Sequence, residues 1–340
     1  VTLYYGGDDV VKEVNLEIKR GETKVILGPS GVGKSTILKA ILGLLRPKQG
    51  EIYVHGREIS KLPESELVKI RLRMAMVFQH SALFDSMTVG ENVSYGLKLS
   101  GHKKNEVTER MMAGLELVGL KGYDKRLPSE LSGGQQQRVA VARALVLEPQ
   151  VLLFDEPLSN LDAKLRRQVR EEIREIQQKL GLTVVYVTHD QEEALAVSDR
   201  IIVMRNAEIA QSGSPRELYE TPSDAFVADF IGEANLIDCT IEKVQGDMAR
   251  VRIGDLKLEL PAREQLSGDA VIAVRPSRIV LSEAGAVDTL PAIIAKSTYV
   301  GSHMEYQLST EFGDLFAVSG RVSQPWAAGD SVGLSFMGSG

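Results

Sequence analysis

GPSGVGKST, residues 28–36, is the stretch that decides the fold of this chain. It fits the phosphate-binding pattern of Gly, four residues, Gly, Lys and Ser. The apolar run 24–27 before it can form a buried strand, and residues 37–42 after it carry apolar side chains at helical spacing. Strand, glycine-rich loop and helix are the setting in which backbone N–H groups bind phosphate oxygens. The sequence therefore predicts a nucleotide site here.

In this phosphate loop (residues 28–36), Lys34 would reach the β- and γ-phosphates and the Ser35 hydroxyl would bind Mg²⁺. The alternative is a glycine-rich turn with an exposed lysine, which would match the whole pattern by chance in about one such chain in a hundred. The predicted phosphate-binding residues are Gly28, Pro29, Ser30, Gly31, Val32, Gly33, Lys34, Ser35 and Thr36.

Length and composition are those of a soluble protein with two domains. The 340 residues suffice for two cores, and the apolar fraction of 43% and charged fraction of 25% are ordinary for globular proteins. The formal charge of −6 argues against a nucleic-acid-coating role. Cys239 is the only cysteine, which favours a reducing compartment. Without a membrane-span or signal-peptide pattern, we expect a cytosolic protein. The start at Val1 without Met suggests a truncated or processed N-terminus.

Apolar patterns alternate between strands and helices over residues 1–235. Continuous apolar runs, typical of strands buried on both faces, occur at residues 24–27, 74–78, 151–154 and 184–187. Helical patterns separate them, which predicts a parallel sheet covered by helices. Residues 85–145 are predicted to form a helical subdomain, and a long helix with an apolar stripe from Leu165 to Leu180 ends at Gly181. Residues 14–19 alternate apolar and polar, which predicts a half-buried antiparallel strand.

The pattern changes beyond Ile231. Leu256, Leu258 and Leu260 alternate with polar residues, and the other apolar runs are short and broken by Pro and Gly. Residues 236–340 therefore read as a small all-β, barrel-like domain. The predicted organisation is one domain at 1–235 and a second at 236–340.

Polar side chains follow the predicted strands. Asp155 and Glu156 come directly after a buried strand, where ligands bind in α/β sheets. Asp155 would hold the water shell of Mg²⁺, and Glu156 would orient or deprotonate the attacking water. His189 and Gln79 also stand at strand ends, where His189 could contact the γ-phosphate and Gln79 the Mg²⁺ or water. A lone histidine after a strand is more often structural, and Gln79 by itself indicates little. Tyr5 could stack on adenine or only pack.

A second glycine-rich turn opening a helix, the signature turn (residues 131–135), is a second anion-binding element. One nucleotide does not need two such elements. A tail-to-head dimer, in which each chain's signature turn closes over its partner's γ-phosphate, explains both. The residues involved are Ser132, Gly133, Gly134 and Gln135.

Together these motifs resemble the ATP-binding subunits of ABC transporters over about residues 3–235. The motifs in order are Walker A at 28–36, Gln79, LSGGQ at 131–135, Walker B at 151–156, the D-loop at 159–162 and the switch histidine His189. The resemblance implies an α/β P-loop NTPase fold, an ABC cassette with a RecA-like core and a helical subdomain. It also implies an ATPase that uses ATP and Mg²⁺.

The family's roles carry over to matching positions. The resemblance implies that Tyr5 stacks on adenine, that Lys34 binds phosphate, and that Ser35, Gln79 and Asp155 serve Mg²⁺. It implies that Glu156 is the general base and His189 the γ-phosphate contact. The signature turn would act in trans, with Asp162 bridging the two sites of the dimer.

Residues 217–232 and 274–276 are similar to the bacterial importer branch that serves sugars, polyamines, ferric iron and sulfate. That branch carries a C-terminal OB-like TOBE domain. The resemblance implies a homodimer at the cytoplasmic face of the inner membrane that drives a transmembrane permease, served indirectly by a solute-binding protein. The stretch 299–306 favours ferric iron, with polyamine next. A sugar or sulfate importer and a soluble non-transport ABC ATPase are the alternatives. The sequence departs from the family pattern at two places. The family's first strand is largely missing, and Ala207 stands where a turn glycine is usual.

Overall fold

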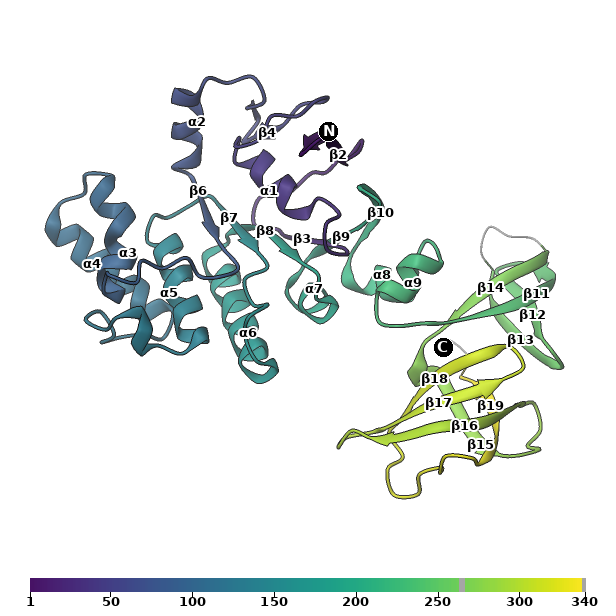
Figure 1. Cartoon of the computed structure of the whole chain (residues 1–340). Helices are drawn as coiled ribbons and strands as arrows, with labels where there is room; N and C mark the ends of the chain where they lie inside the picture. The colour runs from purple at the N-terminus through teal and green to yellow at the C-terminus, as the bar shows by residue number, and fades with distance from the viewer. Residues whose placement is uncertain (263–266, 338–340) are drawn as a thin grey trace. The chain divides into compact units, whose positions relative to one another are not determined.

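The structure, a computed structural model, describes residues 1–262 and 267–337, without the side chains of Tyr5 and Asp8. The chain divides into two compact units, Val1–Leu218 and Tyr219–Gly340. Both are drawn in Figure 1.

A six-stranded sheet forms the centre of the first unit, in the order β10-β9-β3-β8-β7-β6. All neighbours pair in parallel except β9 and β10, which form an antiparallel hairpin at one edge. The predicted parallel sheet is confirmed, and its central strands β3 and β8 are buried throughout. The strands are β3 (Thr23–Leu27), β6 (Met74–Val77), β7 (Val151–Asp155), β8 (Thr183–Thr188), β9 (Arg200–Arg205) and β10 (Glu208–Gly213).

Helices connect these strands, as the sequence predicts. Three of them, α3, α4 and α5, pack on one another as a separate subdomain, and α5 also contacts the edge strand β6 (Figure 1). The long helix α6 ends at Gly181, whose φ of 60° is the left-handed conformation that glycine favours. The helices are α1 (Lys34–Ile41), α2 (Glu64–Arg71), α3 (Val89–Leu99), α4 (Lys104–Leu117), α5 (Gly133–Leu145), α6 (Ala163–Leu180), α7 (Gln191–Val197) and α8 (Pro215–Glu220).

The strand predicted at residues 14–19 is wrong. The structure has a hairpin of β1 (Leu3–Tyr5) and β2 (Asp8–Val11), and then a stretch without strand up to β3. The alternating side chains are nevertheless directed inward, because Leu16 and Ile18 line a cavity of about 770 Å³. A ladder needs a neighbouring strand edge, which this stretch lacks among the described residues.

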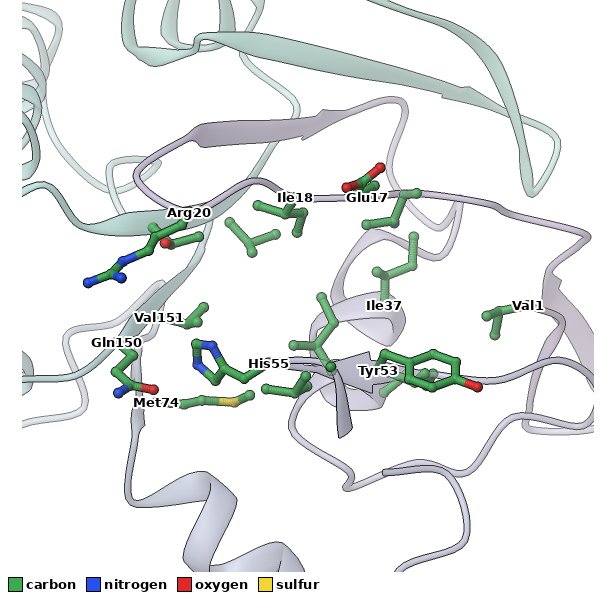
Figure 2. A pocket seen from close by; sticks show the side chains of 18 of the residues that line it. Val1, Glu17, Ile18, Arg20, Ile37, Tyr53, His55, Met74, Gln150 and Val151 are labelled. Atoms are coloured by element: carbon green, nitrogen blue, oxygen red, sulfur yellow. The ribbon is translucent and has the colours of Figure 1, made fainter. Parts of the chain in front are cut away.

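The cavity lies between this irregular stretch and the short hairpin of β4 (Tyr53–Val54) and β5 (Arg57–Glu58). Figure 2 shows Ile18, Tyr53 and His55 around it. Its lining within the described chain includes no residue of the phosphate loop. This cavity is therefore separate from the predicted nucleotide site.

The second unit contains two antiparallel sheets, β13-β12-β11-β14 and β15-β19-β16-β17-β18. They share one core that includes Ile237, Val251, Tyr306 and Leu334, so the all-β prediction is confirmed. Helix α9 (Ala225–Phe230) belongs to this unit. The strands are β11 (Asn235–Gln245), β12 (Met248–Ile253), β13 (Leu256–Pro261), β14 (Gly268–Val274), β15 (Ile279–Glu283), β16 (Leu290–Tyr299), β17 (Met304–Thr310), β18 (Gly313–Ser319) and β19 (Ser331–Phe336).

Two polar side chains join the parts of this unit. Asn235 donates to the Val274 and Phe316 carbonyls at 3.2 and 2.8 Å. Arg275 donates to the Tyr219 and Ala228 carbonyls, at the ends of α8 and α9. Because these bonds hold residues 219–230 to the β strands, the contacts divide at Leu218/Tyr219. The division at 235/236 stays a prediction.

Candidate functional site

The phosphate loop connects β3 to α1, as predicted. Gly31 and Gly33 have φ values of 81° and 98°, the left-handed region that glycine tolerates. A Cβ at Gly33 would lie 2.2 Å from the Val10 carbonyl oxygen, so glycine is needed for packing as well. Within the described chain, no side chain caps the N-terminus of α1. Its first N–H groups are therefore available to an anion.

Lys34 is buried and turns back over its own loop. Its Nζ donates to the Gly28 and Pro29 carbonyls, both at 2.9 Å, and lies 3.8 Å from Glu156 Oε1. Burial lowers the pKa of this amino group, while the Glu156 and Asp155 carboxylates act in the opposite direction. The Lys34 ammonium group is thus held beside the phosphate loop and faces the end of β7.

Ser35, the next residue of the loop, contacts Asp155. The Ser35 hydroxyl donates to Asp155 Oδ1 at 2.7 Å, across 120 residues of sequence. A hydroxyl and a carboxylate are oxygen ligands of the kind that Mg²⁺ takes. The donor set therefore fits the predicted cation.

Glu156 lies between Lys34 and His189. Its Oε2 is 3.0 Å from His189 Nδ1, while Oε1 faces Lys34. Its backbone has φ 46°, an unfavourable conformation for a residue with a side chain, and its N–H donates to the Val187 carbonyl at 2.9 Å. Such strain persists where the surroundings enforce it, often at functional sites. The strand ends of β7 and β8 thus bring Glu156 and His189 together.

The D-loop contacts the main chain of Gln79 and not its side-chain amide. The Asn160 side-chain amide donates to the Gln79 carbonyl at 3.1 Å and lies 2.9 Å from His80 Nδ1. The Gln79 side chain itself is exposed. Asp162 caps α6, because its Oδ1 accepts from the Leu165 N–H at 3.0 Å. Their predicted contacts with a cation or a partner stay predictions.

The signature turn makes no side-chain hydrogen bond to Lys34, Asp155, Glu156 or His189 among the described residues. It caps its own helix α5 instead. Ser132 Oγ accepts from the Gln135 N–H at 3.4 Å, and Gln135 Oε1 accepts from the Ser132 N–H at 3.0 Å, which is a capping box. A Cβ at Gly134 would lie 2.7 Å from both Cδ atoms of Leu165 on α6. Glycine here therefore lets α5 approach α6. Tyr5 ends β1, but its side chain lies outside the described part of the structure.

Sequence reasoning missed the support behind His189. The Thr188 hydroxyl donates to Glu193 Oε2 at 2.5 Å, and Glu193 is 2% exposed. Burial is the main cause that raises the pKa of this carboxyl. The available signal was Glu193 itself, the third residue of a short helix that begins just after His189. The sequence does not show that this carboxyl is buried, because glutamate is almost never fully buried.

A sequence model of the ABC transporter family matches residues 11–159, and one of the TOBE domain matches residues 272–338. The Fe(3+) ions import ATP-binding protein FbpC of Agrobacterium fabrum is 50% identical over 336 residues, 99% of this chain and 94% of that protein. The chain belongs to the ABC transporter family. It is an ABC ATPase with a C-terminal TOBE domain.

A second relative, of the same name, comes from Rhizobium etli and is 52% identical over 98% of this chain and 92% of its own length. Among solved structures, the dimeric ATP-binding cassette MJ0796, bound to ADP and Pi, is 36% identical with a TM-score of 0.57. The matched region covers 63% of this chain and 96% of the MJ0796 chain. Among the described residues, no helix is long and apolar enough to cross a membrane.

Proposed function

We propose that the chain is the ATP-hydrolysing, energy-coupling subunit of a ferric-iron importer. The observation that carries this proposal is the 50% identity to a Fe(3+) import ATP-binding protein over 99% of the chain. This sequence identity also extends over the second unit. It therefore includes more than the ATP-binding cassette, which ABC proteins of many functions share. Polyamine, sugar and sulfate importers and non-transport ABC proteins are the competing functions.

ATP would bind with its phosphates in the cradle of residues 28–36. The N–H groups at the start of α1 would donate to phosphate oxygens, and the Lys34 ammonium would exchange its bonds to the Gly28 and Pro29 carbonyls for bonds to the phosphates. Tyr5 would stack on the adenine. A bound Mg²⁺ would neutralise charge on the phosphates, held by Ser35, Asp155 and Gln79.

Glu156 would then activate water for attack on the γ-phosphorus. Its carboxylate lies within 3.0 Å of His189 and faces Lys34, so it borders the place that the γ-phosphate would take. Glu156 would accept the proton of the attacking water while His189 donates a hydrogen bond to a γ-phosphate oxygen. The bond from phosphorus to the bridging oxygen breaks, and ADP carries the electron pair.

The active form would be a homodimer. Ser132, Gly133, Gly134 and Gln135 lie on another subdomain than the phosphate loop, which fits a role toward a partner's ATP. The solved structure of MJ0796 is dimeric. Asp162 would bridge the two sites, and closure on ATP would drive a transmembrane permease from the cytoplasmic face of the membrane.

The first experiment measures ATP hydrolysis and ATP binding by purified wild type and Glu156→Gln. We expect hydrolysis to fall at least a hundredfold while ATP affinity stays within about threefold, because the amide cannot accept the proton of water. Glu171→Gln is the matched control, since Glu171 is an exposed carboxylate on α6. Hydrolysis by Glu156→Gln at the wild-type rate would refute the role of Glu156.

The second experiment measures uptake of radiolabelled ferric iron in a strain lacking the gene, beside polyamine, sugar and sulfate. We expect loss of ferric-iron uptake alone, restored by wild type and by Glu171→Gln but not by Glu156→Gln. Loss of another solute's uptake, or of none, would contradict the ferric-iron assignment.

A further inference from the structure

Two residues beside His189 hold its backbone in place. Thr188 is held by Glu193, and Asp190 is held from two sides. Asp190 Oδ1 accepts from the Glu193 N–H at 2.9 Å, the N-terminal cap of α7. Asp190 Oδ2 accepts from Arg166 Nη1, also at 2.9 Å. His189 therefore sits on a short segment whose far end depends on a side chain from α6.

The same guanidinium holds the D-loop. Arg166 Nη2 donates to the carbonyl of Leu161 at 3.1 Å. Leu161 is buried and immediately precedes Asp162, so its carbonyl fixes the end of the D-loop where α6 begins. One planar side chain thus bonds to two separate loops, a geometry that the fork of arginine permits and a lysine ammonium does not reproduce.

The D-loop is also tied to Gln79, two residues after β6, because the Asn160 amide donates to the Gln79 carbonyl at 3.1 Å. At the other side of Arg166, His189 faces Glu156 at 3.0 Å. Hydrogen bonds through Arg166 and Asp190 therefore connect the D-loop to the segment that carries His189. The Nε of Arg166 is buried with no hydrogen-bond partner among the described residues, so this arrangement carries an energetic cost.

We infer that Arg166 is a positioning residue for ATP hydrolysis, which couples the D-loop to the orientation of His189 toward Glu156. The inference rests on the proposed ATPase mechanism and adds a residue that touches none of the reacting atoms. Movement of the D-loop on dimer closure would change the position of His189 through the Arg166 side chain, beside the direct bond of Ser159 to the Glu156 carbonyl. Arg166 should consequently affect the rate of the chemical step and leave ATP affinity unchanged.

The test compares ATPase kinetics of Arg166→Ala, Arg166→Lys and Arg167→Ala with wild type. Arg167 is the matched control, because it is the next residue on α6 and its side chain is 75% exposed. We expect kcat of Arg166→Ala to fall at least tenfold with KM for ATP within twofold, and Arg166→Lys to recover only part of the loss. Arg167→Ala should match wild type. A kcat for Arg166→Ala within twofold of wild type would overturn the inference.

A second variant guards against a simple folding defect. Asp190→Asn keeps the cap of α7, since asparagine caps helices as well as aspartate does, but it loses the charged partner of Arg166. We expect it to lower kcat as Arg166→Ala does, and the double variant to lose no more than either single variant. Multiplied losses in the double variant, or an unchanged kcat in Asp190→Asn, would overturn the coupling. A wild type without ATPase activity would instead refute the proposed function.

Discussion

The packing of Gly134 against Leu165 gives a prediction whose size can be worked from the structure. A Cβ added at Gly134 would lie 2.7, 2.7 and 2.8 Å from the Cδ1, Cδ2 and Cγ atoms of Leu165. Non-bonded carbons prefer about 3.5–4.0 Å, so α5 and the side chain of Leu165 must separate by about 1 Å. Overpacking of this kind costs about 1–3 kcal/mol. Replacing glycine by alanine in a helix returns up to about 1 kcal/mol.

We therefore expect Gly134→Ala to lower the free energy of unfolding by about 0–3 kcal/mol. ATPase activity should fall at least tenfold, because the separation displaces the signature turn from α6. The assay is thermal unfolding and ATP hydrolysis of Gly134→Ala, Leu165→Ala and the double variant. Leu165→Ala removes all three crowded atoms, so the double variant should recover most of the activity.

Leu165→Ala by itself is the control and should lose about 1–2 kcal/mol of stability, with activity close to wild type. The reasoning is refuted if the double variant stays as inactive as Gly134→Ala. Glycine at 134 would then be required by something other than α6, such as close approach of a partner's nucleotide.

Two further predictions concern stability. Burial raises the folded-state pKa of Glu193, so the stability that its neutral form provides is fully present below the unfolded pKa of about 4.5 and is lost as pH rises through the folded pKa. Urea unfolding at several pH values measures the free energy of unfolding of Glu193→Gln and of wild type. As pH rises, the stability of the variant relative to wild type should increase, and an unchanged difference in stability at all pH values would contradict this. Ala207→Gly should stabilise the β9–β10 hairpin by about 0.5–1 kcal/mol, because Ala207 has φ 70°. Thermal unfolding checks it, and a lower melting temperature would show that the left-handed strain is not relieved.

Motifs with local geometry could be predicted from the sequence. Residues 28–36 need only a strand before and a helix after them, and both are found in β3 and α1. The helix stop at Gly181 is likewise local, and it occurs. Ala207 has a φ of 70°, which explains why a turn glycine is usual at that position. The strand at 14–19 failed because alternation indicates which side chains face inward but does not supply the neighbouring edge that a ladder requires.

What the sequence by itself determined is the identity of the chemical groups: the phosphate loop, the carboxylates at the end of β7 and the histidine after β8. These follow from motifs whose spacing along the chain is short. Only the tertiary structure decided which groups meet, because Ser35 bonds to Asp155 and Arg166 to Asp190 and Leu161 through the packing of β7, β8 and α6. Such contacts depend on the order and separation of elements in space, and a one-dimensional pattern does not contain those distances.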